Sequence, residues 1–232
     1  MQNAVPAPSP AIDALASRSA ARGLERRRAV YADEVRRLVQ ASFELIRDRG
    51  DLEPRVGEIV RAAGLSNQAF YKHFRSKDEL LLTVLTEGVR VLASYLEHRM
   101  DAVESAPAKI RKWLSGVLEQ ALHPEAASAT RPFAVSRARL AELFPSEVED
   151  CERQLAALLR GAIEAGVASG ELAAADPERD AETVYNLAMG WVQRQLARPE
   201  AELAPASPDD AAHLIEFAMH GLARGSGPPQ GR

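Results

Sequence analysis

A short stretch of the chain combines side chains that can bond a DNA base edge with side chains that can hold a phosphate. Residues 66–74 read Ser-Asn-Gln-Ala-Phe-Tyr-Lys-His-Phe. Asparagine and glutamine can bond an adenine edge through two hydrogen bonds, and serine suits a phosphate or a base edge. Helical spacing divides the stretch into a polar side and an apolar side. The polar side holds Asn67, Gln68, Tyr71 and Lys72, and the apolar side holds Ala69, Phe70 and Phe74.

The residues before this stretch predict a helix that braces it. A short helix is expected to open at Pro54 and to carry Val56, Ile59 and Val60 inward, and the turn around Gly64 ends it. Ser66 is then a suitable N-cap for the next helix. This is the layout of a helix-turn-helix, in which the second helix enters the major groove. Many helical bundles contain such a corner, so the layout alone leaves a purely structural role open.

The next predicted helix has a clear start. Ser76 and Glu79 have the spacing of a capping box, and apolar residues follow at three- and four-residue steps to about His98. Lys77 lies at the beginning of this helix. A helix N-terminus that carries a cation can hold a phosphate, so Lys77 is a further candidate for DNA contact.

These motifs together resemble the TetR family of bacterial transcription regulators. Ala-Gly-x-Ser ends at Ser66, Phe-Tyr-x-His-Phe spans residues 70–74, and Ser-Lys-x-x-Leu spans residues 76–80. The order and the spacing are those of the family. The resemblance covers about residues 31–91 by motif, and the remainder agrees with the family only in being helical.

The resemblance implies a role for each matching residue. Two residues depart from the family pattern: members often carry threonine where this chain has Val56 and alanine where it has Val60. The change at Val56 removes a hydroxyl that could contact a phosphate. Arg55 beside it is a candidate replacement, as is the cluster Arg26 to Arg28, although a solvated face is the simpler interpretation of that cluster. Implied to face bases or phosphates are Ser66, Asn67, Gln68 and Lys72; Tyr71 and His73 would hold the DNA backbone, Lys77 would clamp a phosphate, and Phe70 and Phe74 would be core.

The charge distribution is compatible with this interpretation. Residues 1–77 contain 14 basic and 9 acidic residues, a net charge of +5, although the whole chain has a net charge of −4. Residues 78–232 therefore carry −9. Such asymmetry indicates a nucleic-acid or anionic partner at the basic end. Neighbouring helices with different solvated faces would produce the same asymmetry, so charge alone leaves both explanations open.

The composition predicts an all-α fold of about nine helices. Alanine, leucine, glutamate and arginine dominate, and all are good helix formers. We expect an N-terminal three-helix helix-turn-helix domain followed by a C-terminal helical domain for ligand binding and dimerisation. The expected boundaries are a flexible tail over 1–24, a DNA-binding domain over 25–91 with its motif at about 55–74, an effector-binding and dimerisation domain over 92–224, and a flexible tail over 225–232.

Several other classes of protein are disfavoured by the sequence. The single cysteine, Cys151, excludes an internal disulfide and a cysteine-based zinc cluster. No apolar run approaches the roughly 20 residues of a membrane helix, and no signal peptide is evident. We find no spacing typical of a nucleophile with its base or of a metal site. We therefore expect a cytoplasmic protein that is not an enzyme, with no cofactor, metal or membrane partner.

The C-terminal part yields weaker expectations. A helix is expected over about Pro132 to Phe144, and a second capping box at Ser146 to Glu149 is expected to open the next helix. The resemblance implies a homodimer through helices at about 177–197 and 208–224, and a repressor that a small-molecule effector releases from a palindromic operator. Activation stays open, and the alternative is a helical small-molecule-binding or scaffold protein without specific DNA binding. Arg137 and Arg139 suit an anionic effector or are surface charges. The candidate pocket residues, each also open to a core or rim role, are Tyr95, Trp113, Arg137, Asn186 and Trp191.

Overall fold

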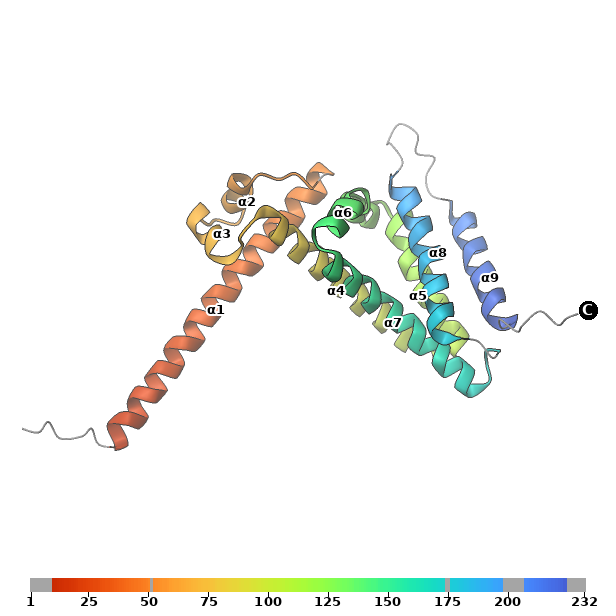
Figure 1. The fold of residues 1–232 in the computed structure, drawn as a ribbon, viewed down its shortest axis with the longest axis horizontal. Helices are drawn as coiled ribbons and strands as arrows, with labels where there is room; N and C mark the ends of the chain where they lie inside the picture. Colours follow the sequence, from red (N-terminus) through yellow and green to blue (C-terminus); the bar gives the residue numbers. More distant parts are fainter. Residues whose placement is uncertain (1–9, 51, 174–175, 198–206, 225–232) are drawn as a thin grey trace, which may run out of the picture.

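The computed structural model describes residues 10–50, 52–173, 176–197 and 207–224. Within these ranges the chain forms nine α-helices and no strand, which confirms the all-α prediction (Figure 1). None of these helices combines the length and the apolar character that crossing a membrane requires. The helices are α1 (Pro10–Arg49), α2 (Val56–Ala62), α3 (Asn67–His73), α4 (Lys77–Asp101), α5 (Ala106–Leu122), α6 (Pro124–Leu143), α7 (Pro145–Ser169), α8 (Pro177–Ala197) and α9 (Pro208–Arg224).

Helix α1 is longer than the sequence pattern predicts. We expected it to begin at Glu25 after a flexible tail, but it begins at Pro10, so residues 10–24 are helical. Alanine, the best helix former, occurs five times between residues 11 and 21. Extending a helix that is already formed is far easier than nucleating one, so the packed part of α1 supports this segment. The remainder of the two predicted tails, residues 1–9 and 225–232, lies outside the described residues.

The first hydrophobic core joins α1 to α2, α3 and the start of α4. Leu38 and Ile46 of α1 meet Ile59 of α2 and Phe70 of α3, and all four are fully buried. Leu140 of α6 and Val148 of α7 belong to the same cluster. The helix-turn-helix therefore rests on helices of both halves of the chain.

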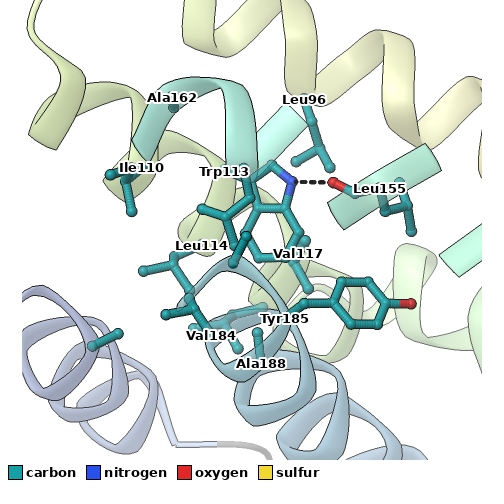
Figure 2. Close-up of a cluster of buried hydrophobic side chains, with 14 of the residues drawn as sticks. Leu96, Ile110, Trp113, Leu114, Val117, Leu155, Ala162, Val184, Tyr185 and Ala188 are labelled. Carbon is teal, nitrogen blue, oxygen red and sulfur yellow. Dashed lines mark hydrogen bonds between the residues drawn. The ribbon is translucent and has the colours of Figure 1, made fainter. Parts of the chain in front are cut away.

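The second core surrounds Trp113 of α5 (Figure 2). The indole is fully buried, and its Nε1 donates a hydrogen bond to the Leu155 carbonyl of α7, 3.1 Å away. Tyr185 of α8 lies beside it, with 6.2 Å between the ring centroids. A buried indole N–H needs such an acceptor. The hydrogen bond fixes α5 against α7 while the ring fills the space next to α8.

Helix α4 links the two cores. Leu80, Leu81 and Val84 of its first turns are buried in the first core, and Leu96 and Met100 are buried in the second. The predicted cap is confirmed, because the Ser76 hydroxyl accepts a hydrogen bond from the Glu79 amide at 3.1 Å. A movement of α4 is therefore transmitted to both halves of the molecule.

Two predicted helix starts in the C-terminal half are wrong. Helix α6, expected to begin at Pro132, begins at Pro124, and Pro132 is buried inside it. Both prolines can occupy a first turn, and the sequence does not decide between them. Helix α7 begins at Pro145, and Ser146, expected to cap it, bonds the neighbouring Glu147 carboxylate instead. The bounds predicted for α8 and α9 are confirmed.

Candidate nucleic-acid interface

The turn between α2 and α3 is held from the side by α1. Gly64 has a φ of +63°, a left-handed conformation that favours glycine. The guanidinium of Arg37 donates to the carbonyl oxygens of Ala63, at 2.5 Å, and of Gly64, at 3.1 Å. One α1 side chain therefore fixes the corner of the helix-turn-helix, and with it the direction in which α3 points.

Helix α3 starts at a capped residue and packs one side inward. The Ser66 hydroxyl accepts a hydrogen bond from the Ala69 amide at 3.1 Å. This use of an oxygen lone pair leaves the hydroxyl proton able to donate to a phosphate. Phe70 and Phe74 are buried, with 5.8 Å between their ring centroids. These contacts hold the short helix in place although it has only seven residues.

The predicted polar side of α3 faces solvent. Asn67 and Gln68 are exposed on its first turn, and Tyr71, with 63% of its surface exposed, and Lys72 lie one turn further on. Residues four apart in a helix are neighbours, so these four side chains form one continuous surface. This surface, which we call the α3 face, offers two amides, a phenol and an ammonium group.

A carboxylate of α1, which the sequence did not single out, organises the end of α3. Glu34 Oε2 lies 3.0 Å from Lys72 Nζ and 2.6 Å from His73 Nε2. The hydrogen bond from Lys72, followed by that from His73, lowers the pKa of the Glu34 carboxyl. Tyr31 packs its ring edge-on against His73 at 4.2 Å and lies under Lys72 at 5.6 Å. Lys72 is thus held in position while its side chain stays exposed.

His73 does not occupy the position that the resemblance implies. We expected it to hold the DNA backbone, but its side chain is fully buried between α1 and α3. One ring nitrogen contacts Glu34, and the other, Nδ1, has no hydrogen-bond partner. The ring packs against Tyr31. His73 therefore positions Glu34 and Tyr31, and cannot reach a phosphate through its ring in this conformation.

The remaining predicted cations lie at the starts of the two helices on either side of α3 in the chain. Arg55 is exposed at the start of α2, where its backbone N–H donates to Glu58 Oε2 at 2.8 Å. Glu58 also receives the Arg49 guanidinium at 2.6 Å, and the hydrogen bond from Arg49, followed by that from Arg55, lowers its pKa to about 2. Lys77 is half-buried at the start of α4, with Nζ 2.7 Å from Glu53.

Glu53 also receives a cation from the other half of the chain. Arg139 of α6 donates to Glu53 at 2.7 Å and to Asp78 of α4 at 2.9 Å. Hydrogen bonds from Lys77 and then from Arg139 lower the Glu53 pKa. Arg139 was expected either to bind an anionic effector or to be a surface charge. The structure favours the second role, as an ion pair at the domain boundary. The Arg139 side chain therefore connects α6 to Glu53, which pairs with Lys77, and to Asp78, the residue after Lys77.

The five candidate pocket residues do not assemble into one site. The Tyr95 hydroxyl of α4 accepts a hydrogen bond from Arg99 at 2.7 Å and donates one to Glu119 of α5 at 2.8 Å. Tyr95 therefore links α4 to α5. Arg137 pairs with Glu152 of α7. The other three are separately placed: Trp113 is in the second core, Asn186 is exposed on α8, and Trp191 is half-buried on α8.

Tyr185 was not among the predicted pocket residues, but it interacts with two that were, Trp113 and Arg137. Tyr185 packs against Trp113 (Figure 2). The charges of Glu152 and Arg137 act on its phenol. Burial raises the pKa of Tyr185, and the charge of Glu152 adds to the effect. A buried, neutral phenol near an arginine is a polar group inside an otherwise apolar core. Only the packing of α5, α6, α7 and α8 brings these residues together.

The described helices match solved structures of regulators over most of their length. A TetR-family regulatory protein from Rhodococcus RHA1 is 21% identical, with a TM-score of 0.58 over 82% of this chain and 97% of that one. FadR from Bacillus subtilis, in complex with stearoyl-CoA, is 17% identical, with a TM-score of 0.58 over 81% and 96%. AibR, in complex with isovaleryl coenzyme A and operator DNA, is 15% identical, with a TM-score of 0.55 over 82% and 98%.

The fold and the α2–α3 corner define a helix-turn-helix DNA-binding domain. Residues 38–84 match the family model of bacterial regulatory proteins of the TetR family. The resemblance seen in the motifs is therefore confirmed over this segment, which is a DNA-binding domain of the TetR-family type. The matched segment contains every predicted DNA-contact residue, from Arg55 to Lys77.

Proposed function

We propose that this protein is a transcriptional repressor that binds a palindromic operator as a homodimer and is released by a small-molecule effector. The observation that carries the proposal is the α3 face, where Asn67, Gln68, Tyr71 and Lys72 are exposed together on the second helix of a TetR-family domain. Such a helix fits the major groove, where base edges are distinguishable.

The contacts divide into two kinds. Asn67 and Gln68 lie at the N-terminal end of α3, the end that reaches base edges in helix-turn-helix proteins, and their amides suit an adenine. Ser66, Tyr71 and Lys72 would bond phosphates or base edges beside them. Arg55 and Lys77, on either flank, would fix the register through phosphates. His73 is left out of this set because its ring is buried.

Dimerisation is proposed through α8 and α9, which lie next to one another at the end of the molecule away from α3 (Figure 1). Phe217 of α9 has 65% of its surface exposed and Leu187 of α8 has 37%. Exposed apolar side chains on two adjacent helices support a surface that a partner covers, and aromatic residues are enriched in such interfaces. In a two-fold dimer the two α3 helices would need to lie one helical turn of DNA apart, roughly 34–36 Å.

The effector is proposed to bind in the C-terminal half near Arg137 and Tyr185. Support comes from the charge of Arg137 acting on the buried Tyr185 phenol, which packs against Trp113, and from two proteins of the same fold that are in complex with acyl-coenzyme A molecules. An arginine suits the negative charge of such a ligand. A separate groove of about 390 Å³ between α5 and α9, lined in part by Arg111 and Lys112, is a second place for an anionic group.

Release of the operator would follow from the contacts that join the two halves of the chain. Because α4 contributes to both cores and Arg139 of α6 pairs with Glu53 and Asp78, a shift of either helix changes the position of α3. The effector weakens DNA binding only if it prefers the conformation in which the two α3 helices no longer fit the operator.

The proposal is tested by in vitro selection of duplexes from a random-sequence pool with the full chain. We expect an inverted repeat to be enriched, and its binding to weaken with salt and with Lys72→Ala. Lys109→Ala on α5 removes the same charge far from α3 and is the matched control. Stearoyl-CoA and isovaleryl-CoA are the effector probes. Equal, weak binding to every duplex would contradict the proposal and favour a helical ligand-binding protein without specific DNA binding.

A further inference from the structure

The basic charge of the N-terminal part is concentrated in one segment of α1. Residues 18–30, which we call the α1 extension, contain five arginines and one glutamate, a net charge of +4. Residues 31–77 contain nine basic and seven acidic residues, a net charge of only +2. The predicted DNA-contact cations Lys72 and Lys77 are each paired with a glutamate. Most of the net positive charge of residues 18–77 therefore lies in the extension.

The extension is a helix that contacts little else in the described structure. Every residue from 18 to 30 is exposed except Gly23, which is half-buried. In Figure 1 this part of α1 projects past α2 and α3, away from the C-terminal half. At 1.5 Å per residue its 13 residues span about 20 Å, more than half a turn of B-DNA. A helix without packing is only marginally stable in water, so a surface that binds it would also stabilise it.

The C-terminal end of the extension lies next to the last turn of α3. Tyr31 packs against His73 and under Lys72, so the chain leaves the DNA-binding domain beside the exposed end of α3. Arg27 lies one helical turn before Tyr31 and hence on the side of α1 that faces α3. The basic surface of the extension is thus continuous with the α3 face through Lys72.

The arrangement of the arginines favours a polyanion as the partner. Arg22 and Arg26 are four residues apart, which places like charges next to each other on one side of the helix, an arrangement that costs stability. The exposed apolar residues Leu24 and Val30 are six positions apart and lie on different sides. A membrane-surface helix or a coiled coil requires one apolar stripe, which these positions do not form.

We infer that the α1 extension is a second DNA-binding element, whose arginines contact the phosphates beside the half-site that α3 occupies. The inference rests on the proposed function and adds an element outside the matched domain, which starts at residue 38. Phosphate contacts are independent of sequence, so the extension contributes to affinity on any duplex and leaves the choice of sequence to α3.

The test compares two triple variants of the full chain. Arg22→Gln/Arg26→Gln/Arg27→Gln removes three charges from the extension, and Lys109→Gln/Arg153→Gln/Arg160→Gln removes three from α5 and α7. Binding is measured at several salt concentrations to the selected duplex and to a 40-base-pair duplex of mixed sequence. Circular dichroism checks that the helix content of each variant matches that of the wild type.

We expect the extension variant to lose about tenfold or more in affinity on both duplexes at about 150 mM salt. The slope of log affinity against log salt should fall in magnitude by about 3, because each phosphate contact contributes roughly 0.9. The control variant should change neither quantity by a comparable amount. An extension variant that matches the control on both duplexes overturns the inference, even if the wild type prefers the selected duplex. A wild type that shows no preference, with the extension variant still weakened, overturns the proposed function instead.

Discussion

The guanidinium of Arg139 lies 2.7 Å from a carboxylate oxygen of Glu53, and this contact joins α6 of the C-terminal half to the edge of the DNA-binding domain. The same carboxylate lies 2.7 Å from the ammonium group of Lys77. Glu53 therefore contacts Lys77, which is proposed to hold a phosphate, and Arg139, which belongs to the half of the chain proposed to bind the effector. This shared carboxylate is the most direct electrostatic connection between the two halves that the described contacts show.

The first prediction follows from this connection. Glu53→Gln removes a negative charge beside the proposed phosphate clamp and frees Lys77, so affinity for the selected duplex should rise about two- to fivefold, the range expected of exposed ion pairs. Arg139→Gln removes a cation that shares Glu53 with Lys77, so Glu53 holds Lys77 more strongly and the affinity should fall by a similar factor. Fluorescence anisotropy measures both, and Glu149→Gln on α7 is the control. Weaker binding of Glu53→Gln would show that Glu53 holds Lys77 in its DNA-binding position.

The second prediction separates recognition of sequence from affinity on the α3 face. Gln68→Ala should cost about 1–3 kcal/mol on the selected duplex and much less on a scrambled one, because an amide that bonds a base edge contributes only where that base is present. Lys72→Ala should weaken both duplexes alike and reduce the salt dependence. Competition binding on the two duplexes checks this. Equal losses from Gln68→Ala on both would remove Gln68 from base recognition.

The third prediction concerns the α2–α3 turn. Gly64→Ala forces a Cβ into a left-handed residue and to within 2.8 Å of Arg37 Nη2, so it should destabilise the protein by at least about 1–2 kcal/mol and weaken DNA binding. Gly57→Ala is the matched control, since its Cβ would meet nothing within 4 Å and it lies inside α2. That variant should be neutral or slightly stabilising. Denaturant unfolding measures both, and equal stabilities would be inconsistent with the strained turn.

The fourth prediction is a pH dependence that Glu58 produces. Arg49 and the Arg55 amide lower the Glu58 pKa from 4.5 to about 2 in the folded protein. A depressed pKa means that the stabilisation is fully present above about pH 4.5 and is lost as the pH falls toward 2. Glu58→Gln should therefore lower the Tm at pH 7 and show a smaller difference from the wild type at pH 3.5. A difference that stays constant with pH would mean that packing, rather than charge, makes Glu58 matter.

The fifth prediction tests the proposed dimer. Phe217→Asp places a charge at the centre of the exposed side of α9 and should convert the dimer to a monomer, as light scattering after gel filtration would show. Affinity for the selected inverted repeat should fall by more than tenfold, because two half-sites are no longer bound together. Val135→Asp on α6, where Val135 is 60% exposed, is the control. Dimers that persist in Phe217→Asp would place the interface elsewhere.

The sequence was most informative where its signals are local. The cap at Ser76, the cap at Ser66 and the alternation of exposed and buried residues in α3 depend on residues within one or two turns of each other. The motifs at residues 63–80 likewise identified the family, because their spacing reflects a short and rigid corner. Local signals did not fix the start of α6, because Pro124 and Pro132 can both occupy the first turn of a helix.

Tertiary structure decided the relations between residues far apart in the chain. Glu34 meets Lys72 and His73 across 38 and 39 residues, and no local pattern indicates that an α1 carboxylate would bury the histidine ring. Arg139 reaches Glu53 across 86 residues. Composition and periodicity by themselves determined an all-helical protein with a helix-turn-helix. Which charges on that scaffold face outward and which neutralise one another was decided by packing, because an ion pair depends on the distance between two side chains in space and not on their separation in sequence.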